Sequence, residues 1–268
     1  MTDKISYEDV LYEEKNRVAT ITFNRPERLN AFRTQTYLDT IDAINRAGWN
    51  RDIGVIVLTG AGERAFGVGG DVKEERKDLR VGSGRGTVGN SVEELQTVIR
   101  DVPKPLIAKV RGYAVGASNV MVTLCDLAIA ADTAIFGQNG PRVGSVDPGF
   151  GTAGLARIVG QKKAREMWYL CRKYSAAEAL QMGLINHVVP EAELDAEVDT
   201  WCTEITERSP TAIAIAKRSF NADTESIRGI GLLGFEALAL YFGTNEAKEG
   251  GNAFREKRTP DFFAAAQS

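Results

Sequence analysis

The sequence predicts an α/β fold, with strands and helices alternating up to about residue 150 and helices dominating the remainder. Three observations support this prediction. The runs 17–23 and 53–60 are apolar and rich in β-branched residues, as strands are. Between them, from Tyr37 to Ile44, apolar residues recur at helical spacing, and beyond residue 150 nearly all the spacing is helical. We expect one domain, with a core at 1–205 and a helical region at 206–268.

The predicted strands of the first part end in glycine-rich turns. Run 53–60 is continuously apolar, which is typical of a strand buried on both faces, and the turn 67–71 follows it. Run 105–110 predicts another strand, followed by the turn 112–117 and a buried helix at 118–124. The other expected elements are short strands at 127–131, 134–136 and 184–189, helices at 93–99, 152–172, 190–207 and 226–248, helices after the N-cap residues Ser175 and Ser209, and a mobile polar stretch at 74–90.

The composition argues against several classes of protein. Lys and Arg number 33 and Asp and Glu number 36, whereas a nucleic-acid-binding protein usually has a basic excess. His187 is the single histidine and lies in a short strand-like run, so a zinc site made of several histidines is excluded and catalysis has to use carboxylates, hydroxyls and backbone amides. Three widely spaced cysteines predict reduced thiols, and the chain has neither an apolar leader nor an 18-residue apolar run. We expect a cytoplasmic protein that binds neither a membrane nor nucleic acid.

Two of the glycine-rich turns enter helices and are candidates for an oxyanion hole. They are Gly69-Gly70-Asp71 and Gly116-Ala117-Ser118. Small residues let a ligand approach the backbone, and two N–H groups from two such turns can stabilise one developing negative charge. Either cluster taken alone is better explained as a tight turn. Neither has the spacing of a nucleotide-binding motif.

A third loop, 137–151, holds polar residues between glycines and prolines directly after a predicted buried strand. Loops held on rigid strands are common places for functional residues. Ser145 and Asp147 provide a hydroxyl and a carboxylate that can face one cavity. A helix N-cap role for either residue is the competing interpretation.

These segments together carry a resemblance to the crotonase (enoyl-CoA hydratase/isomerase) superfamily. The resembling segments are 24–26, 29–32, 65–71, 104–105, 112–116 and 125–130, within a match from about residue 7 to 263. The resemblance implies a spiral of ββα turns with a C-terminal helical trimerisation region, and a homo-oligomer that is a trimer or a dimer of trimers. It also implies a CoA thioester substrate whose carbonyl oxygen binds the N–H groups of Gly70 and Ala117.

The resemblance implies further site residues. Asp147 acts as the base and Ser145 hydrogen-bonds Asp147 or the substrate ketone. The residues implied to contact the substrate or CoA are Arg28, Val68, Gly69, Asp71, Lys73, Tyr113, Phe242, Phe254 and Lys257, of which Phe254 and Lys257 reach the CoA of a neighbouring subunit. Gln138, Asn139, Gly140 and Trp168 match a site at which a relative binds bicarbonate, and Gly140 is expected to leave space there. No metal and no tightly bound cofactor is implied.

The branch of the superfamily follows from departures within these motifs. Val120 and Gly140 stand where the hydratases have two glutamates, so hydration is not expected. Segments 84–105 and 208–221 resemble the ring-opening 2-ketocyclohexanecarboxyl-CoA hydrolases. Where the related 1,4-dihydroxy-2-naphthoyl-CoA synthases have tyrosines, this chain has Val81 and Phe242. We expect hydrolytic ring opening of a cyclic β-keto acyl-CoA to a dicarboxylic acyl-CoA. The synthase's intramolecular Claisen condensation and an RNA-binding or non-catalytic protein remain alternatives.

Overall fold

The computed structural model describes residues 6–71 and 90–267. Most of the stretch 74–90, together with Lys73 and Val81, lies outside the described residues.

Ten strands form two sheets within the described residues. The larger has the order β1-β2-β3-β5-β7-β10, with β1 and β2 antiparallel and the other neighbours parallel. The smaller has the order β4-β6-β8-β9, with only β8 and β9 antiparallel. The bounds are β1 Val10–Lys15, β2 Val18–Phe23, β3 Val55–Gly60, β4 Ala65–Gly67, β5 Leu106–Val110, β6 Tyr113–Val115, β7 Leu127–Ala131, β8 Ile135–Gly137, β9 Lys173–Ser175 and β10 His187–Val189.

The fold is α/β and repeats a ββα unit. Each unit gives one strand to the large sheet, the next strand to the small sheet, and then a helix, as in β5, β6 and α4 (Ala117–Leu124). The next unit is β7, β8 and α5 (Gly140–Val143). Because β4, β6 and β8 pair in parallel, the turns that follow them lie side by side at one edge of the small sheet.

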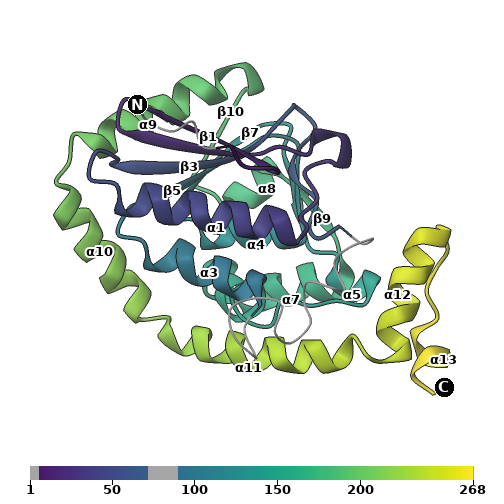
Figure 1. The fold of residues 1–268 in the computed structure, drawn as a ribbon. Coiled ribbons are helices and arrows are strands. Elements are labelled where there is room, and N and C mark those ends of the chain that lie inside the picture. Colours follow the sequence, from purple (N-terminus) through teal and green to yellow (C-terminus); the bar gives the residue numbers. More distant parts are fainter. Residues whose placement is uncertain (1–5, 72–89, 268) are drawn as a thin grey trace.

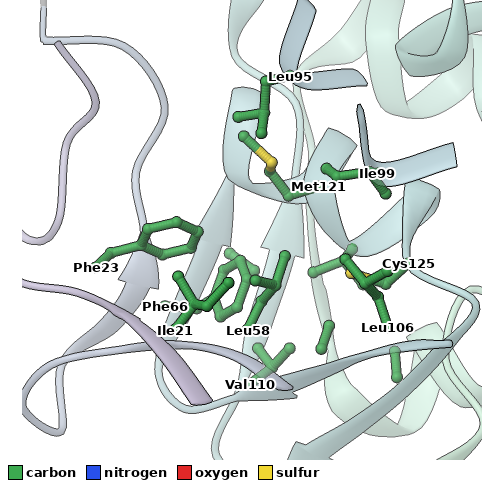
Figure 2. Close-up of a cluster of buried hydrophobic side chains, with 14 of the residues drawn as sticks. Ile21, Phe23, Leu58, Phe66, Leu95, Ile99, Leu106, Val110, Met121 and Cys125 are labelled. Carbon is green, nitrogen blue, oxygen red and sulfur yellow. The ribbon is translucent and has the colours of Figure 1, made fainter. Parts of the chain in front are cut away.

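The large sheet is buried on both faces, as the apolar run 53–60 predicted. Ile56 and Leu58 of β3 pack in the main core, while Val55 and Val57 pack on the opposite face. The main core is covered by α1 (Thr34–Trp49), α3 (Ser91–Asp101) and α4, and the other face by α9 (Leu194–Thr206). Figure 2 shows part of the main core, where Leu95 of α3 and Met121 of α4 lie above Phe66 and Leu58.

The C-terminal helices differ from the prediction in one respect. The prediction of a single helix at 226–248 is wrong. This region forms two helices, α11 (Glu225–Tyr241) and α12 (Asn245–Glu256), with a bend of 77° between them. Thr244 begins α12 as its N-cap by accepting a hydrogen bond from the Ala247 N–H. Together α11 and α12 pass the length and composition test for a membrane span only as this bent pair, and within the described residues no single helix passes it. In Figure 1, α10 (Pro210–Ala222) and α11 run round the edge of the ββα body, and α12 and α13 (Phe262–Ala266) follow.

Other differences concern short elements. The helix expected at 152–172 is divided into η2 (Phe150–Gly154), α6 (Leu155–Val159) and α7 (Gln161–Leu170), with Gly160 at φ +83° between the last two. Ser175 and Ser209 are N-caps as expected, of α8 (Ala176–Gln181) and α10. The sequence missed β1, β4, β6 and β9, and the short turns η1 (Pro26–Arg28) and η3 (Glu191–Glu193).

A buried cation fastens α10 to the body of the protein. Lys217 is 6% exposed, and its ammonium donates to the carbonyls of Ile99 and Lys104. The same group lies 2.9 Å from the Asp126 carboxylate. All three donors of the ammonium are therefore used on elements distant in sequence.

Replacement of Lys217 with Met is expected to lower the free energy of unfolding by about 3 kcal/mol, because two carbonyls lose this donor and the Asp126 carboxylate loses its cation and keeps only the Leu106 N–H. Urea denaturation at a fixed protein concentration measures this change. Arg218→Met, on the exposed face of the same helix, is the matched control and should unfold like the wild type. Equal midpoints for both variants would show that Lys217 is not an anchor.

Candidate active site

A cavity of about 110 Å³ lies where the three parallel strands of the small sheet end. It gathers most of the residues that the sequence singled out. The predicted site residues that line this cavity are Val68, Gly69, Gly70, Ala117, Gln138, Asn139, Gly140, Ser145, Asp147, Trp168 and Phe254. Residues from three separate turns and from the C-terminal helix α12 therefore surround one space.

The first turn directs the Gly70 N–H into this cavity. The Gly69 carbonyl accepts a hydrogen bond from the Phe32 N–H, and the Asp71 N–H donates to the Phe32 carbonyl. Because a trans peptide points its C=O and N–H in opposite directions, the Gly70 N–H faces away from Phe32, toward the cavity that Gly70 lines. Gly69 has φ +88°, a conformation that favours glycine.

The second turn brings a helix N-terminus to the same place. Gly116, at φ +64°, is the N-cap of α4 and Ala117 is its first residue. The first N–H groups of a helix have no partner within it, so the Ala117 N–H is available to a ligand. A Cβ built on Gly69 would lie 3.4 Å from the Ala117 nitrogen, so the two turns are in backbone contact. The Ser118 hydroxyl, fully buried, accepts a hydrogen bond from the Gly69 N–H at 3.3 Å and ties the turns together.

Asp147 is the carboxylate of the cavity. Its Oδ1 accepts the Gly151 N–H at 2.9 Å, and its Oδ2 accepts the side-chain amide of Gln96 at 2.6 Å. Burial raises the pKa of Asp147 to about 6, although both hydrogen bonds lower it. A carboxyl with such a pKa can take and return a proton near neutral pH.

The partner of Asp147 differs from the one the sequence predicted. Ser145 lines the same cavity, and its backbone N–H donates to the Gly140 carbonyl. Among the described residues the Asp147 carboxylate is held by Gln96 and Gly151 instead, because α3 packs behind the loop. Gly151 has to be glycine here, since a Cβ would lie 2.6 Å from the Asp147 Cβ. No local pattern in the sequence pointed to Gln96, which lies 51 positions from Asp147.

The remaining wall of the cavity is apolar. It consists of Tyr37, Val92, Val120, Val143, Val146, Phe235 and Leu238. Val120 and Gly140, which stand where the resemblance puts two hydratase glutamates, both line the cavity. Asp147 is therefore the one carboxylate among the described lining residues.

Of the four residues matched to a bicarbonate site, Trp168 and Gly140 are already in contact with other groups of the protein. The Trp168 indole N–H donates to the Gly151 carbonyl at 2.5 Å. The space expected at Gly140 is filled, because a Cβ there would lie 2.5 Å from the Ser145 carbonyl oxygen and 2.7 Å from the Trp168 ring. The Gln138 side chain, 1% exposed, keeps a buried amide nitrogen with no partner among the described residues. Asn139, the fourth of these residues, also lines the cavity.

A second groove, of about 830 Å³, adjoins the cavity. Val68, Gly70, Asn139 and Phe254 line both spaces, so the groove leads to the oxyanion turn. Arg28, Asp71, Tyr113 and Lys257 lie in its lining, as does the basic pair Lys173 and Arg255, which the sequence analysis missed. Lys173 lies over the Tyr113 ring, 4.9 Å from its centroid.

Four further residues singled out by the sequence have the following positions. Asp71 lines the groove, but its carboxylate pairs with Arg25 at 3.1 Å. Phe242, expected to contact substrate, lines neither the cavity nor the groove; it caps α11 and packs against the main core. Phe254 and Lys257, expected at a neighbouring subunit's CoA, lie at the groove of their own chain.

His187 lies away from the candidate site. His187 stacks on Trp201, with 6.2 Å between ring centroids, and lies outside the lining of both spaces. Within residues 6–71 and 90–267 no three His, Cys, Asp or Glu side chains are arranged to hold a metal ion. The polar groups of the described cavity lining include backbone amides, the Asp147 carboxylate, and the side chains of Tyr37, Gln138, Asn139 and Ser145.

Comparison with known proteins agrees with this fold. The structure resembles an enoyl-CoA hydratase from Mycobacterium avium subsp. paratuberculosis K-10, with a TM-score of 0.84, 27% identity, and coverage of 96% of this chain and 99% of that one. An enoyl-CoA hydratase/isomerase from Pseudoalteromonas atlantica T6c has a TM-score of 0.79 and 27% identity over 95% of this chain and 99% of its own. An enoyl-CoA hydratase from Bacillus anthracis has a TM-score of 0.74 and 29% identity, covering 95% of this chain and 98% of its own.

These neighbours define a class of proteins with the crotonase fold, whose chemistry is the processing of acyl-CoA thioesters. The model of the enoyl-CoA hydratase/isomerase family matches residues 13–265. The chain belongs to the enoyl-CoA hydratase/isomerase family.

Ala117→Pro tests the oxyanion hole by removing one N–H. Proline is tolerated at the first position of a helix, which Ala117 occupies, so the fold should persist. Loss of one oxyanion donor should lower kcat by about 10²–10³. Steady-state kinetics and a thermal melt measure the two effects. Unchanged turnover in a folded variant would remove Ala117 from the hole.

The pKa of Asp147 predicts the pH dependence of the reaction. A base works only while ionised, so kcat/KM should fall as the pH drops through about 6. The profile between about pH 4.5 and 8 measures this limb for the free enzyme. A profile that stays flat down to pH 4.5 would contradict the assignment of Asp147 as a base.

Proposed function

We propose that this protein opens the ring of a cyclic β-keto acyl-CoA by adding water, giving a dicarboxylic acyl-CoA. The observation that supports the proposal most is the junction of the two spaces at Gly70. A CoA thioester lying in the basic groove places its carbonyl at this junction, between the N–H groups of Gly70 and Ala117. Its acyl group then extends into the cavity toward Asp147.

The proposed reaction begins with a water molecule beside Asp147. The carboxylate takes a proton from the water, and the hydroxide attacks the carbon of the ring ketone. The tetrahedral alkoxide collapses to a carboxylic acid, and the bond between this carbon and the α-carbon breaks. Its electron pair forms the thioester enolate, whose oxygen is held by the Gly70 and Ala117 N–H groups. Asp147 returns its proton to the α-carbon, so one water is added and no redox partner is needed.

Four features of the cavity support this reaction, and the first also argues against hydration. Only Asp147 among the described lining residues is a carboxylate, whereas the resemblance gives the hydratases a pair. The apolar wall suits an alicyclic acyl group. The cavity volume of about 110 Å³ is close to that of an engineered apolar protein cavity that binds benzene, about 150 Å³. A cavity of this size suits a single ring. Ser145, in the same lining, is placed to hydrogen-bond the ring ketone in this proposal.

The groove supplies the binding of CoA in this proposal. Arg28, Lys173, Arg255 and Lys257 give its lining a positive charge that suits the phosphates. The single acidic residue of the described lining, Asp71, is paired with Arg25 and does not offset that charge. Tyr113 offers an aromatic surface at the same groove.

The C-terminal helices support a homo-oligomer. Phe220, Leu233, Leu240 and Phe263 are all exposed in the single chain, although large apolar side chains are normally covered. We propose that copies of this chain cover them in a trimer or a dimer of trimers.

The proposed function is tested by incubating the protein separately with 2-ketocyclohexanecarboxyl-CoA and with o-succinylbenzoyl-CoA. The masses of the products are measured by mass spectrometry. We expect the first to gain one water, and we expect Asp147→Asn to lower its turnover by at least about 10², the scale of general-base catalysis. His187→Ala is the matched control, remote from the cavity, and should keep wild-type turnover. Loss of water from the second substrate would identify the synthase reaction. No turnover of either, with salt-sensitive RNA binding, would favour a non-catalytic role.

A further inference from the structure

Gln96 lies behind the carboxylate that faces the cavity. It is on α3, is 5% exposed, and is not among the residues that line the cavity. Its amide nitrogen donates to Asp147 Oδ2 at 2.6 Å. The bond therefore connects α3 to the loop between α5 and η2, without Gln96 itself reaching the space where a substrate would lie.

Two donors fix the plane of the Asp147 carboxylate. The last torsion of an aspartate is broad, so contacts outside the residue decide its orientation. The Gly151 N–H holds Oδ1 from within the loop, and Gln96 holds Oδ2 from the neighbouring helix. An ionised carboxylate has about four acceptor sites, and this arrangement uses two of them. The others remain for a water molecule in the cavity.

We propose that Gln96 is a positioning residue, whose amide holds the Asp147 carboxylate toward the cavity and stabilises its ionised form. The inference rests on the proposed function, because that function gives Asp147 its work as a base. It extends the site by a residue that acts only through Asp147.

Nearby charged groups do not account for the shifted pKa of Asp147. The other titratable side chain of the described lining is Tyr37. Of the elements packed around the loop, α4 and η2 carry no charged side chain. The others carry Glu93, Glu94, Arg100 and Asp101 on α3, Glu225, Arg228 and Glu236 on α11, Arg142 on α5, Arg157 on α6, Lys162, Lys163, Arg165 and Glu166 on α7, and Glu246, Lys248, Glu249, Arg255 and Glu256 on α12. The pKa of Asp147 is raised by burial and lowered by Gly151 and Gln96, with no charged neighbour among its causes. Removal of the Gln96 amide should therefore raise the pKa of Asp147.

The test follows the titration of Asp147 in the free protein. Aspartate labelled with ¹³C at the carboxyl is observed by NMR, and the Asp147→Asn variant identifies the signal. In Gln96→Met, which keeps the size of the side chain and loses the donor, the midpoint should rise by about one pH unit, as expected for loss of one hydrogen bond to a charged group. Gln96→Glu should raise it further, because two carboxylates then share the site. Thr97→Ala, the next position on α3, is the control and should leave the midpoint unchanged.

Kinetics separate positioning from folding. In Gln96→Met we expect kcat to fall about tenfold, KM to stay within about twofold, and the acid limb of kcat/KM to move to higher pH with the NMR midpoint. An unchanged Asp147 midpoint in both Gln96 variants would overturn the inference. The inference would also be overturned if the Asp147 titration midpoint moved while the kinetics did not. In that case kcat and the acid limb of kcat/KM would stay at their wild-type values on a substrate that the enzyme turns over. If the wild type turns over neither test substrate, the proposed function fails, while the titration still decides the role of Gln96.

Discussion

Parallel pairing of three very short strands decides where the chemistry of this protein is placed. β4, β6 and β8 each have three residues. The turns that follow them contain Gly69, Gly116 and Gly140. Because the strands run the same way, the three turns emerge at one edge. A hydrogen bond from the Gly116 N–H to the Gly137 carbonyl joins the second turn to the third, and Ser118 joins the second to the first. The oxyanion donors and the Asp147 loop follow from this arrangement.

The backbone part of the site could be predicted from the sequence because it depends on local rules. Glycine at 69 and 116 signals turns of unusual φ, and each turn leads on from a predicted strand. The functional groups there are N–H groups, so their placement needs only the turn and the first residue of a helix. The convergence of the two turns could be expected from the parallel sheet, although β4 and β6 themselves were too short to be recognised.

The side-chain part of the site could not be predicted to the same extent, because packing between distant segments decides it. Gln96 meets Asp147 only because α3 lies behind the loop. Gly140 looked like an open space in sequence, but α7 places the Trp168 ring there. Phe242 looked like a residue of a continuous helix, because the N-cap at Thr244 lies between two stretches that are both helical. With the helix ended there, Phe242 turns to the core instead of the cavity.

The environment of Asp147 shows how a single carboxylate can do work that other members of the family are expected to share between two. An apolar wall alone would push its pKa so high that it would be protonated at neutral pH and useless as a base. Donors on both oxygens alone would push the pKa so low that it would hardly accept a proton from water. Burial together with two donors leaves the pKa at about 6, between the two limits. A carboxylate so balanced can release the proton it has just accepted, and the proposed ring cleavage by water gives both steps to Asp147.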